Sequence, residues 1–292
     1  MSIHAATTNP AFSTIRENSL DVLADMISCC LNPEKSAIFR QSDIPELPQL
    51  HLIFSYLITV SGLERNPVYK EQKQELHLNG NGLSRFLLYP VLQAADICLY
   101  KREFIPVGKH QVPHIEITIE IARRTNTLCN REIFPLPEAL LTEMPKIPGI
   151  DGRKMSKSYD NFIALSDSSD ETRNKIFQMV TDVKKPRLSD PGHPDECKLF
   201  QLMKCYENGN TIVQIKEDCK EGKIGCRKVC KPHLFQVLND AMREPRRIRN
   251  ELINDNNGLE NILRNGAEMT RNRAIETIKE IRTALGFSVR VE

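Results

Sequence analysis

The loop at residues 152–158, GRKMSKS, carries the most distinctive chemistry in this chain. Two lysines, Lys154 and Lys157, stand three residues apart in a turn rich in serine. An ammonium group offers three N–H donors on a long, flexible stem, and such point charges stabilise negative charge that develops during a reaction. The spacing therefore predicts a loop that binds a polyphosphate, with a solvated basic turn as the alternative. The other residues of this candidate loop site are Met155, Ser156 and Ser158.

A second candidate site lies in the apolar segment 87–97, LLYPVLQAADI, whose only charged side chain is Asp96. A buried carboxylate needs a partner. Tyr89, Gln93 and Asp96 stand three to four residues apart and would share one face of a helix. These side chains would line a pocket for a ligand with an apolar body and one N–H donor. The alternative is a helix carboxylate that a local basic group satisfies.

The third candidate is the segment 107–111, VGKHQ, in which strand-like sequence ends at Gly108 and a helix begins. In an open α/β sheet, ligands bind at the carboxyl ends of the strands, and a helix N-terminus there favours anions. Gly108 would allow a nucleotide to approach the backbone closely. An ordinary strand-to-helix turn is the alternative.

The elements that must position these residues alternate between strand and helix in the first half of the chain. Apolar periodicity predicts helices at about 9–30, 50–60, 86–100 and 111–124, and strands at 36–40 and 104–108. This alternation is typical of an α/β domain with a parallel sheet. Past the lysine loop only helical periodicity recurs, at 171–180, 198–206, 228–242 and 258–285. We therefore expect an α/β domain at 1–165 and an all-helical domain at 166–292.

Composition excludes several classes of protein. The 292 residues carry a formal net charge of +2, so net charge alone indicates no nucleic-acid partner. No apolar run reaches the roughly 18 residues of a membrane span. The first residues, MSIHAA, lack the pattern of a signal peptide. We expect a cytoplasmic protein whose nine cysteines are reduced thiols or metal ligands.

Six segments of the chain together resemble one enzyme family. They are, in order, LNPEKSAIFRQSDIPE, LERNPVYKEQ, YPVLQAADI, FIPVGKHQVPHIEITIEIARR, PEALLTEMPKIPGIDGRKMSKS and DPGHPDECKLF. They resemble bacterial-type tryptophanyl-tRNA synthetase, and KMSKS is the second signature of class I aminoacyl-tRNA synthetases. The resemblance extends over essentially the whole chain. It implies a Rossmann-like catalytic domain, a helical domain that binds the tRNA anticodon, and a homodimer.

The resemblance also implies a role for each candidate residue. Asp96 would accept the indole N–H of tryptophan, and Gln93 would line the indole pocket. Tyr89 and Gln111 would hold the α-amino group of the substrate, and Gly108 would lie against the adenylate. The implied function is a tryptophan–tRNA ligase that binds tryptophan, ATP with Mg²⁺, and tRNA(Trp).

In the same family the lysine loop binds ATP and acts in catalysis. Lys154 and Lys157 would clamp the phosphates while the tryptophan carboxylate attacks the α-phosphorus and pyrophosphate leaves. Met155, Ser156 and Ser158 would complete the ATP-binding loop. Catalysis of this kind consists mostly of positioning and charge stabilisation. The adenylate is then transferred to the 3′ end of the tRNA.

Two departures from the family pattern concern ATP. His110 stands where the family generally has an acidic residue that accepts the ribose hydroxyls, so we expect weaker ATP binding. Residues 1–60 contain no His-Ile-Gly-His-type motif, so the catalytic domain is expected to lack the family's first strand, signature helix and second strand. The alternative function is therefore a truncated paralogue that binds tryptophan or tRNA without activating the amino acid.

Late cysteines and basic residues give two further expectations. Segment 219–230 resembles a cysteine-rich segment that holds a [4Fe–4S] cluster in some members of the family. The four candidate ligands, which would also suit structural zinc, are Cys197, Cys219, Cys226 and Cys230. Their spacing differs by one residue from the family pattern, so unliganded packing cysteines are the alternative. Basic residues between 216 and 249 would contact tRNA phosphates, or form solvated helix faces.

Overall fold

The computed structural model describes residues 4–5, 14–75, 84–141, 147–156 and 159–287. The chain forms two compact units that interleave in sequence. The first unit comprises Met1–Leu23, Asn32–Glu143 and Asn256–Glu292, and the second comprises Ala24–Leu31 and Met144–Asp255. The sequence predicts a boundary at about residue 165 between a catalytic domain and a tRNA-binding domain. This division into two functional domains stays a prediction.

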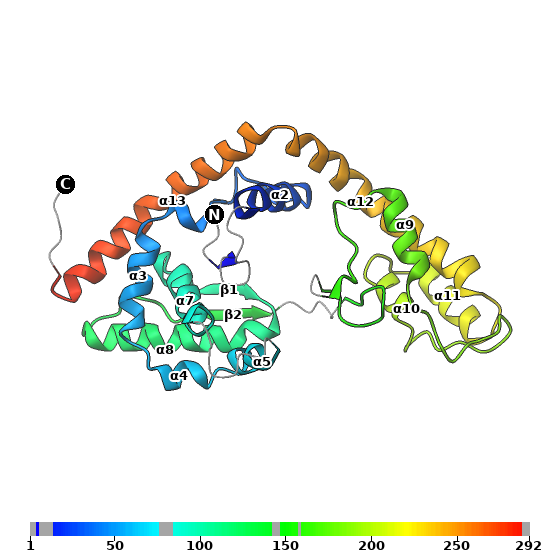
Figure 1. Ribbon diagram of the computed structural model, residues 1–292, viewed down its shortest axis with the longest axis horizontal. Helices are drawn as coiled ribbons and strands as arrows, with labels where there is room; N and C mark the ends of the chain where they lie inside the picture. The colour runs from blue at the N-terminus through cyan, green and yellow to red at the C-terminus, as the bar shows by residue number, and fades with distance from the viewer. Residues whose placement is uncertain (1–3, 6–13, 76–83, 142–146, 157–158, 288–292) are drawn as a thin grey trace. The chain divides into compact units, whose positions relative to one another are not determined.

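A parallel sheet lies in the first unit (Figure 1). Strand β1 (Phe104–Val107) pairs with β2 (Glu138–Leu141), and the register places Phe104 opposite Glu138 and Val107 opposite Leu141. Helix α8 (Val112–Leu128) connects the two strands. Parallel strands require such a crossover. The predicted α/β class with a parallel, Rossmann-like sheet is confirmed.

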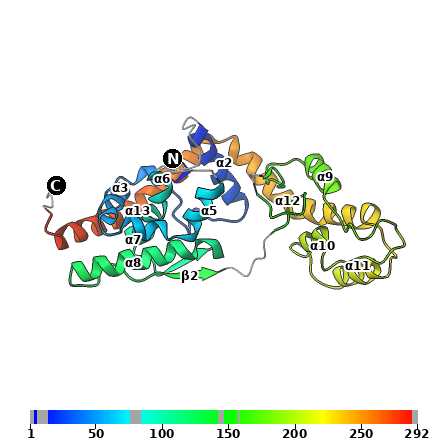
Figure 2. The same cartoon turned by 60° about the horizontal axis from the view of Figure 1, so that its bottom comes forward.

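The core of the first unit forms where three helices pack. Helix α7 (Tyr89–Leu99) contacts both α8 and α3 (Glu46–Ser55), and α7 and α8 lie side by side in both views (Figure 2). Nearly every position of α7 is apolar and buried, as expected for a helix surrounded by other elements. Phe54 on α3 meets Phe134 edge-to-face, with ring centroids 5.5 Å apart. This packing fixes the helix that carries Asp96.

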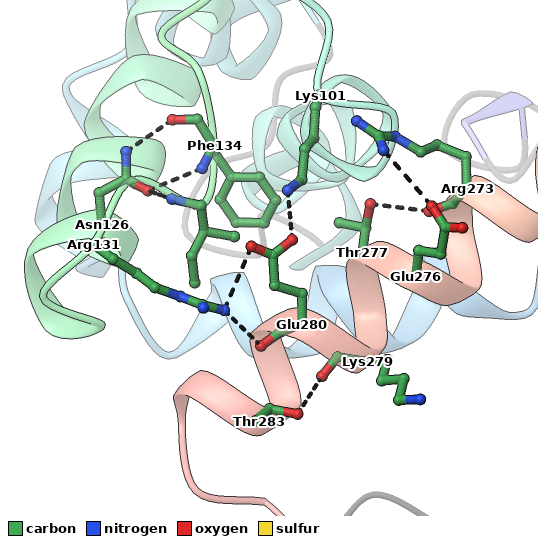
Figure 3. Close-up of polar contacts among 11 residues, drawn as sticks. Lys101, Asn126, Arg131, Phe134, Arg273, Glu276, Thr277, Lys279, Glu280 and Thr283 are labelled. Carbon is green, nitrogen blue, oxygen red and sulfur yellow. Dashed lines mark hydrogen bonds and ion pairs between the residues drawn. The ribbon is translucent and has the colours of Figure 1, made fainter. Parts of the chain in front are cut away.

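The long helix α13 (Asn256–Ala284) packs into this core through Ala267, Ala274, Ile278 and Ile281. Gly266 lies against the backbone of Ile38, where an added Cβ would come within 2.0 Å of the carbonyl oxygen. Near the other end, Glu280 accepts from Lys101 Nζ at 2.5 Å and pairs with Arg131 at 3.4 Å (Figure 3). The predicted helix at 258–285 is therefore present and belongs to the first unit.

The predicted strand at 36–40 was wrong. These residues run as irregular chain and join no strand ladder within the described residues. Their β-branched and aromatic content suggested a strand, but here Ile38 packs against α13 instead. The remaining short elements of the chain up to α8 are α2 (Ile15–Ser28), η2 (Gln41–Asp43), α4 (Val60–Glu64), α5 (Pro67–Glu75), α6 (Ser84–Leu87) and η3 (Lys109–Gln111).

The second unit is helical throughout its named elements. They are α9 (Ser169–Gln178), α10 (Lys198–Met203), α11 (Asn210–Lys220), η5 (Cys226–Cys230) and α12 (Lys231–Ile253). Ser168 and Glu171 form a capping box that starts α9. Ile176, Leu199 and Leu234 are fully buried in its core. In the part of the chain that the structure describes, no helix is long and apolar enough to cross a membrane.

Candidate functional site

Asp96 is the centre of a closed ring of hydrogen bonds in the first unit. The Gln41 amide Nε2 donates to both carboxylate oxygens of Asp96, at 2.8 Å each. The imidazole Nε2 of His4 lies 3.0 Å from Asp96 Oδ2, and the His4 backbone N–H donates to Gln41 Oε1 at 3.0 Å. An ionised carboxylate only accepts hydrogen bonds, so Nε2 of His4 carries the proton. A partly exposed face of α7 thus presents a carboxylate that binds N–H donors.

Tyr89 completes the wall of this site. Its ring lies 4.2 Å from the His4 imidazole and 5.6 Å from that of His114, measured between centroids. Burial, with the nearby charge of Asp96, raises the pKa of Tyr89, so the phenol keeps its proton at neutral pH. The structure therefore brings Tyr89 and Asp96 together around one aromatic ring, as their spacing predicted. Gln93 is half-buried on the same helix, one turn from each of them.

Two further histidines enclose the site and stay neutral. Asn66 Oδ1 accepts from the Val68 backbone N–H, which orients the amide so that Nδ2 donates to His114 Nδ1 at 3.0 Å. Burial, reinforced by His110 and His4, lowers the pKa of His114 to about 4. Burial also lowers the pKa of His51. The charge of His4 adds to this effect, and that of Asp96 opposes it. These side chains place neutral polar groups around Asp96 and Tyr89.

The end of β1 places the residues predicted to lie near the adenylate. Gly108 precedes η3, and the Gln111 backbone N–H donates to the Gly108 carbonyl at 2.8 Å. A Cβ on Gly108 would come within 3.0 Å of His110 Cε1, so the exposed His110 ring lies against the glycine. Both His110 and His4 contribute to the lowered pKa of His114. This turn therefore lies close to the Asp96 site.

The N-terminal half of the lysine loop lies in the second unit and is held by Asn161. This side chain is 1% exposed; it accepts from the Ser156 backbone N–H at 2.8 Å and donates to the Lys154 carbonyl at 3.1 Å. The Met155 backbone N–H donates to the Ile147 carbonyl at 2.8 Å. Lys154 itself is exposed. Lys157 and Ser158 lie outside the described residues.

Asn161 also shapes the turn before the lysines. Its Nδ2 donates to Asp151 Oδ1 at 2.7 Å, and that hydrogen bond is the main cause that lowers the pKa of Asp151. A Cβ on Gly149 would come within 2.4 Å of the Asn161 amide, so this approach requires glycine. The loop is thus preorganised up to Ser156, with the Lys154 ammonium directed to solvent.

The four cysteines predicted as metal ligands do not form a metal site as they stand. Among the described residues, which include all four, no group of three or more His, Cys, Asp or Glu side chains could hold a metal ion. Cys197, Cys219 and Cys230 are buried, and burial raises the pKa of Cys197 and Cys219. Cys226 and Cys230 are the first and last residues of a π-helical turn. This wider turn accommodates the extra residue between them.

Many of the basic residues predicted to contact tRNA already have acidic partners. Lys216 pairs with Asp195 at 2.7 Å, Arg247 pairs with two glutamates of its own helix, and Arg249 pairs with Asp25 at 2.6 Å. Arg227 and Lys228 are exposed. The ion pairs favour the solvated-face interpretation for part of this set.

Several residues of these sites are not among those that the sequence pattern singles out. They are His4, Gln41, His51, Asn66, His114 and Asn161. Most of their contacts cross long stretches of chain, such as the 92 residues between His4 and Asp96. The contacts of Asn161 are local, with partners 5 to 10 residues earlier in the chain. The one local signal was the polar pair His110 and His114 at a helix start, four residues apart.

Comparisons with known proteins identify the family. A family model described as class I tRNA synthetases (W and Y) matches residues 2–243. The tryptophan–tRNA ligase of Thermotoga maritima is 40% identical over 286 residues, which cover 97% of this chain and 87% of that protein. The tryptophan–tRNA ligase of Aquifex aeolicus is 36% identical, over 94% of this chain and 86% of that protein.

A solved structure is similar as well. The crystal structure of tryptophanyl-tRNA synthetase from Campylobacter jejuni, complexed with ADP and tryptophan, matches with a TM-score of 0.86 at 33% identity. The match covers 97% of this chain and 87% of that one. Sequence and fold therefore point to the same family over nearly the whole chain.

Proposed function

The chain belongs to the class I tRNA synthetases of the tryptophan and tyrosine group, and we propose that it acts as a tryptophan–tRNA ligase. The observation that carries the choice of amino acid is Asp96, an ionisable acceptor on the apolar helix α7 that already binds two N–H donors. An indole ring is an apolar body with one N–H, so it fits such a site.

The reaction has two steps. The tryptophan carboxylate attacks the α-phosphorus of ATP, a carboxyl–phosphate bond forms, and pyrophosphate leaves together with its Mg²⁺. A ribose hydroxyl at the 3′ end of tRNA(Trp) then attacks the carbonyl carbon of the adenylate, and AMP leaves. The enzyme contributes orientation and charge stabilisation rather than a covalent intermediate.

We assign the residue roles in the same terms. Asp96 accepts the indole N–H, and Gln93 lines the indole pocket on the same helix. Tyr89, whose phenol stays protonated, and Gln111 hold the α-amino group. Gly108 lies against the adenylate. The His110 ring lies against Gly108, and a neutral imidazole offers the ribose hydroxyls one acceptor instead of the two oxygens of a carboxylate, so ribose binding is weaker.

The lysine loop would supply the phosphate contacts. Lys154 and Lys157 stabilise charge on the leaving pyrophosphate, and Met155, Ser156 and Ser158 shape the loop around ATP. Support comes from the hold of Asn161 on this segment, which fixes the backbone up to Ser156 and leaves Lys154 exposed. Positioned cations of this kind act mainly when charge develops in the transition state.

Partners and location follow from the same proposal. Residues 1–165 would carry catalysis and residues 166–292 the anticodon contacts, with Arg227 and Lys228 as exposed cations for phosphate. We propose a homodimer in the cytoplasm, where tRNA is charged.

The [4Fe–4S] cluster or zinc ion stays a proposal that rests on donor chemistry alone. The Cys230 thiol donates to Cys226, and this lowers the pKa of Cys226 and favours the thiolate that metals bind. Iron and zinc analysis of the protein and of Cys226→Ser tests it.

Tryptophan-dependent exchange of pyrophosphate into ATP tests the function. We expect exchange with tryptophan and none with tyrosine, and strong loss of tryptophan exchange in Asp96→Ala. Tryptophan binding without any exchange would favour the non-activating alternative. Failure of tryptophan to bind would show that the assignment of the Asp96 site is wrong.

A further inference from the structure

Gln41 holds the acceptor carboxylate from a segment of chain outside α7. It begins the short turn η2, and its single amide nitrogen lies 2.8 Å from Oδ1 and 2.8 Å from Oδ2 of Asp96. The terminal torsion of an aspartate is soft, so a carboxylate on its own adopts a wide range of orientations. The Gln41 amide on both oxygens and the His4 imidazole on Oδ2 alone together restrict this torsion.

The position of Gln41 is itself fixed. The preceding residue, Arg40, pairs with Glu260 of α13 at 2.7 Å and donates to Ser19 of α2 at 3.3 Å. The Arg40 carbonyl also accepts from the Asp43 backbone N–H at 2.9 Å, which closes η2. The turn η2, which begins at Gln41, is therefore held by α2 and α13 through Arg40.

The count of lone pairs on Asp96 shows where a ligand can bind. A carboxylate offers about two acceptor sites on each oxygen. Gln41 uses one on each oxygen, and His4 uses the second on Oδ2 at 3.0 Å. Among the described residues, no lysine or arginine forms an ion pair with Asp96, whose side chain is 34% exposed. With respect to the described residues, the acceptor that stays open is on Oδ1.

We propose that Gln41 is a positioning residue that sets the Asp96 carboxylate so that Oδ1 receives the ring N–H of the amino-acid substrate. The inference rests on the proposed function, because it names the group that makes the tryptophan site selective for an N–H donor. Gln41 does not touch the substrate in this account. It acts through Asp96, and its effect is on selectivity for the ring N–H rather than on general affinity.

The test compares two ligands that differ in one atom. L-Tryptophan carries the ring N–H, and L-β-(3-benzothienyl)alanine has sulfur in its place. The chain contains no tryptophan residue, so the fluorescence of bound tryptophan is free of protein indole background, and the analogue is measured by displacement. Wild type, Gln41→Met, Gln41→Glu and Gln41→Ala are titrated, and the ratio of the two dissociation constants is the readout.

Gln41→Met keeps side-chain length without an amide, and Gln41→Glu keeps an acceptor for the His4 N–H. Both should lower the preference for tryptophan about ten-fold, since a hydrogen bond to a charged acceptor is lost or misdirected, with analogue affinity nearly unchanged. The matched control is Gln236→Glu, which alters an exposed glutamine that donates to Asp240 at 2.7 Å in the second unit. Its ratio should equal that of wild type.

Three outcomes would overturn the inference. A wild-type ratio in both Gln41→Met and Gln41→Glu would show that the amide donor has no role. An equal loss of affinity for both ligands would indicate a packing role instead of positioning. If the wild-type protein binds neither amino acid, the proposed function fails, and this inference fails with it. Thermal unfolding of each variant identifies any that do not fold, in which case the remaining two decide.

Discussion

Replacing His114 with asparagine should remove an acid-sensitive part of the stability of the first unit. His114 is 3% exposed on α8, and its Nδ1 accepts from Asn66 at 3.0 Å. Burial lowers its pKa to about 4 from the ordinary 6.5, because a buried imidazolium loses its hydration. Asparagine keeps an acceptor oxygen near the Asn66 amide but cannot take up a proton.

The magnitude follows from the linkage between protons and folding. Below the unfolded pKa of 6.5 the unfolded chain binds a proton that the folded chain refuses until about pH 4. The part of the folding stability that depends on a neutral His114 is therefore fully present above pH 6.5 and is lost as pH falls toward 4. Across the whole window the loss is about 3 kcal/mol, of which about 2 kcal/mol falls between about pH 7 and about pH 5.

Urea unfolding of both proteins at these two pH values measures the effect. The free energy of unfolding should fall more steeply with acid in wild type than in His114→Asn, by about 2 kcal/mol. All other titrating groups are common to the two proteins and cancel in the comparison. Equal acid dependence in both would refute the reasoning, because His114 would then titrate alike in the folded and unfolded states.

Three other changes test separate parts of the structure. Gly266→Ala should destabilise the protein by about 3 kcal/mol, because the new Cβ meets the carbonyl of Ile38 at 2.0 Å; a wild-type midpoint in thermal unfolding would contradict this. Glu280→Gln should cost about 1 kcal/mol, since Lys101 is only partly buried and Arg131 is exposed, and a loss of several kcal/mol in urea would show a larger role. Lys154→Ala should slow pyrophosphate exchange about a hundred-fold with tryptophan affinity unchanged; weaker tryptophan binding would argue against a role limited to phosphate.

Much of the fold could be predicted because local pattern and tertiary structure agree. The apolar run at 86–100 became α7, and the strand-like segment that stops at Gly108 became β1. Asp96 could be singled out because a single carboxylate in an apolar run demands a partner, and the structure gives it Gln41 and His4. Helical spacing placed Tyr89 on the same face, and its ring lies against that of His4. The binding roles of both residues stay predictions.

Other features depend on contacts that the local pattern does not contain. β2 reads Glu-Ala-Leu-Leu, which are good helix formers, and it is a strand because β1 pairs with it. Residues 36–40 have strand-forming side chains, yet within the described residues they pair with no strand. His4 and Gln41 reach Asp96 across 92 and 55 residues of sequence, so their roles became visible only in the folded chain.

The most direct test of the central claim is the transfer of labelled tryptophan to tRNA(Trp) by the purified chain in the presence of ATP and Mg²⁺. The account predicts tryptophanyl-tRNA that accumulates with time, none with tyrosine, and little with Asp96→Ala. Charging with tyrosine, or tryptophan charging that is unchanged in Asp96→Ala, would contradict the assignment of this site to the indole N–H. No charging with either amino acid would contradict the claim that this chain is a tryptophan–tRNA ligase.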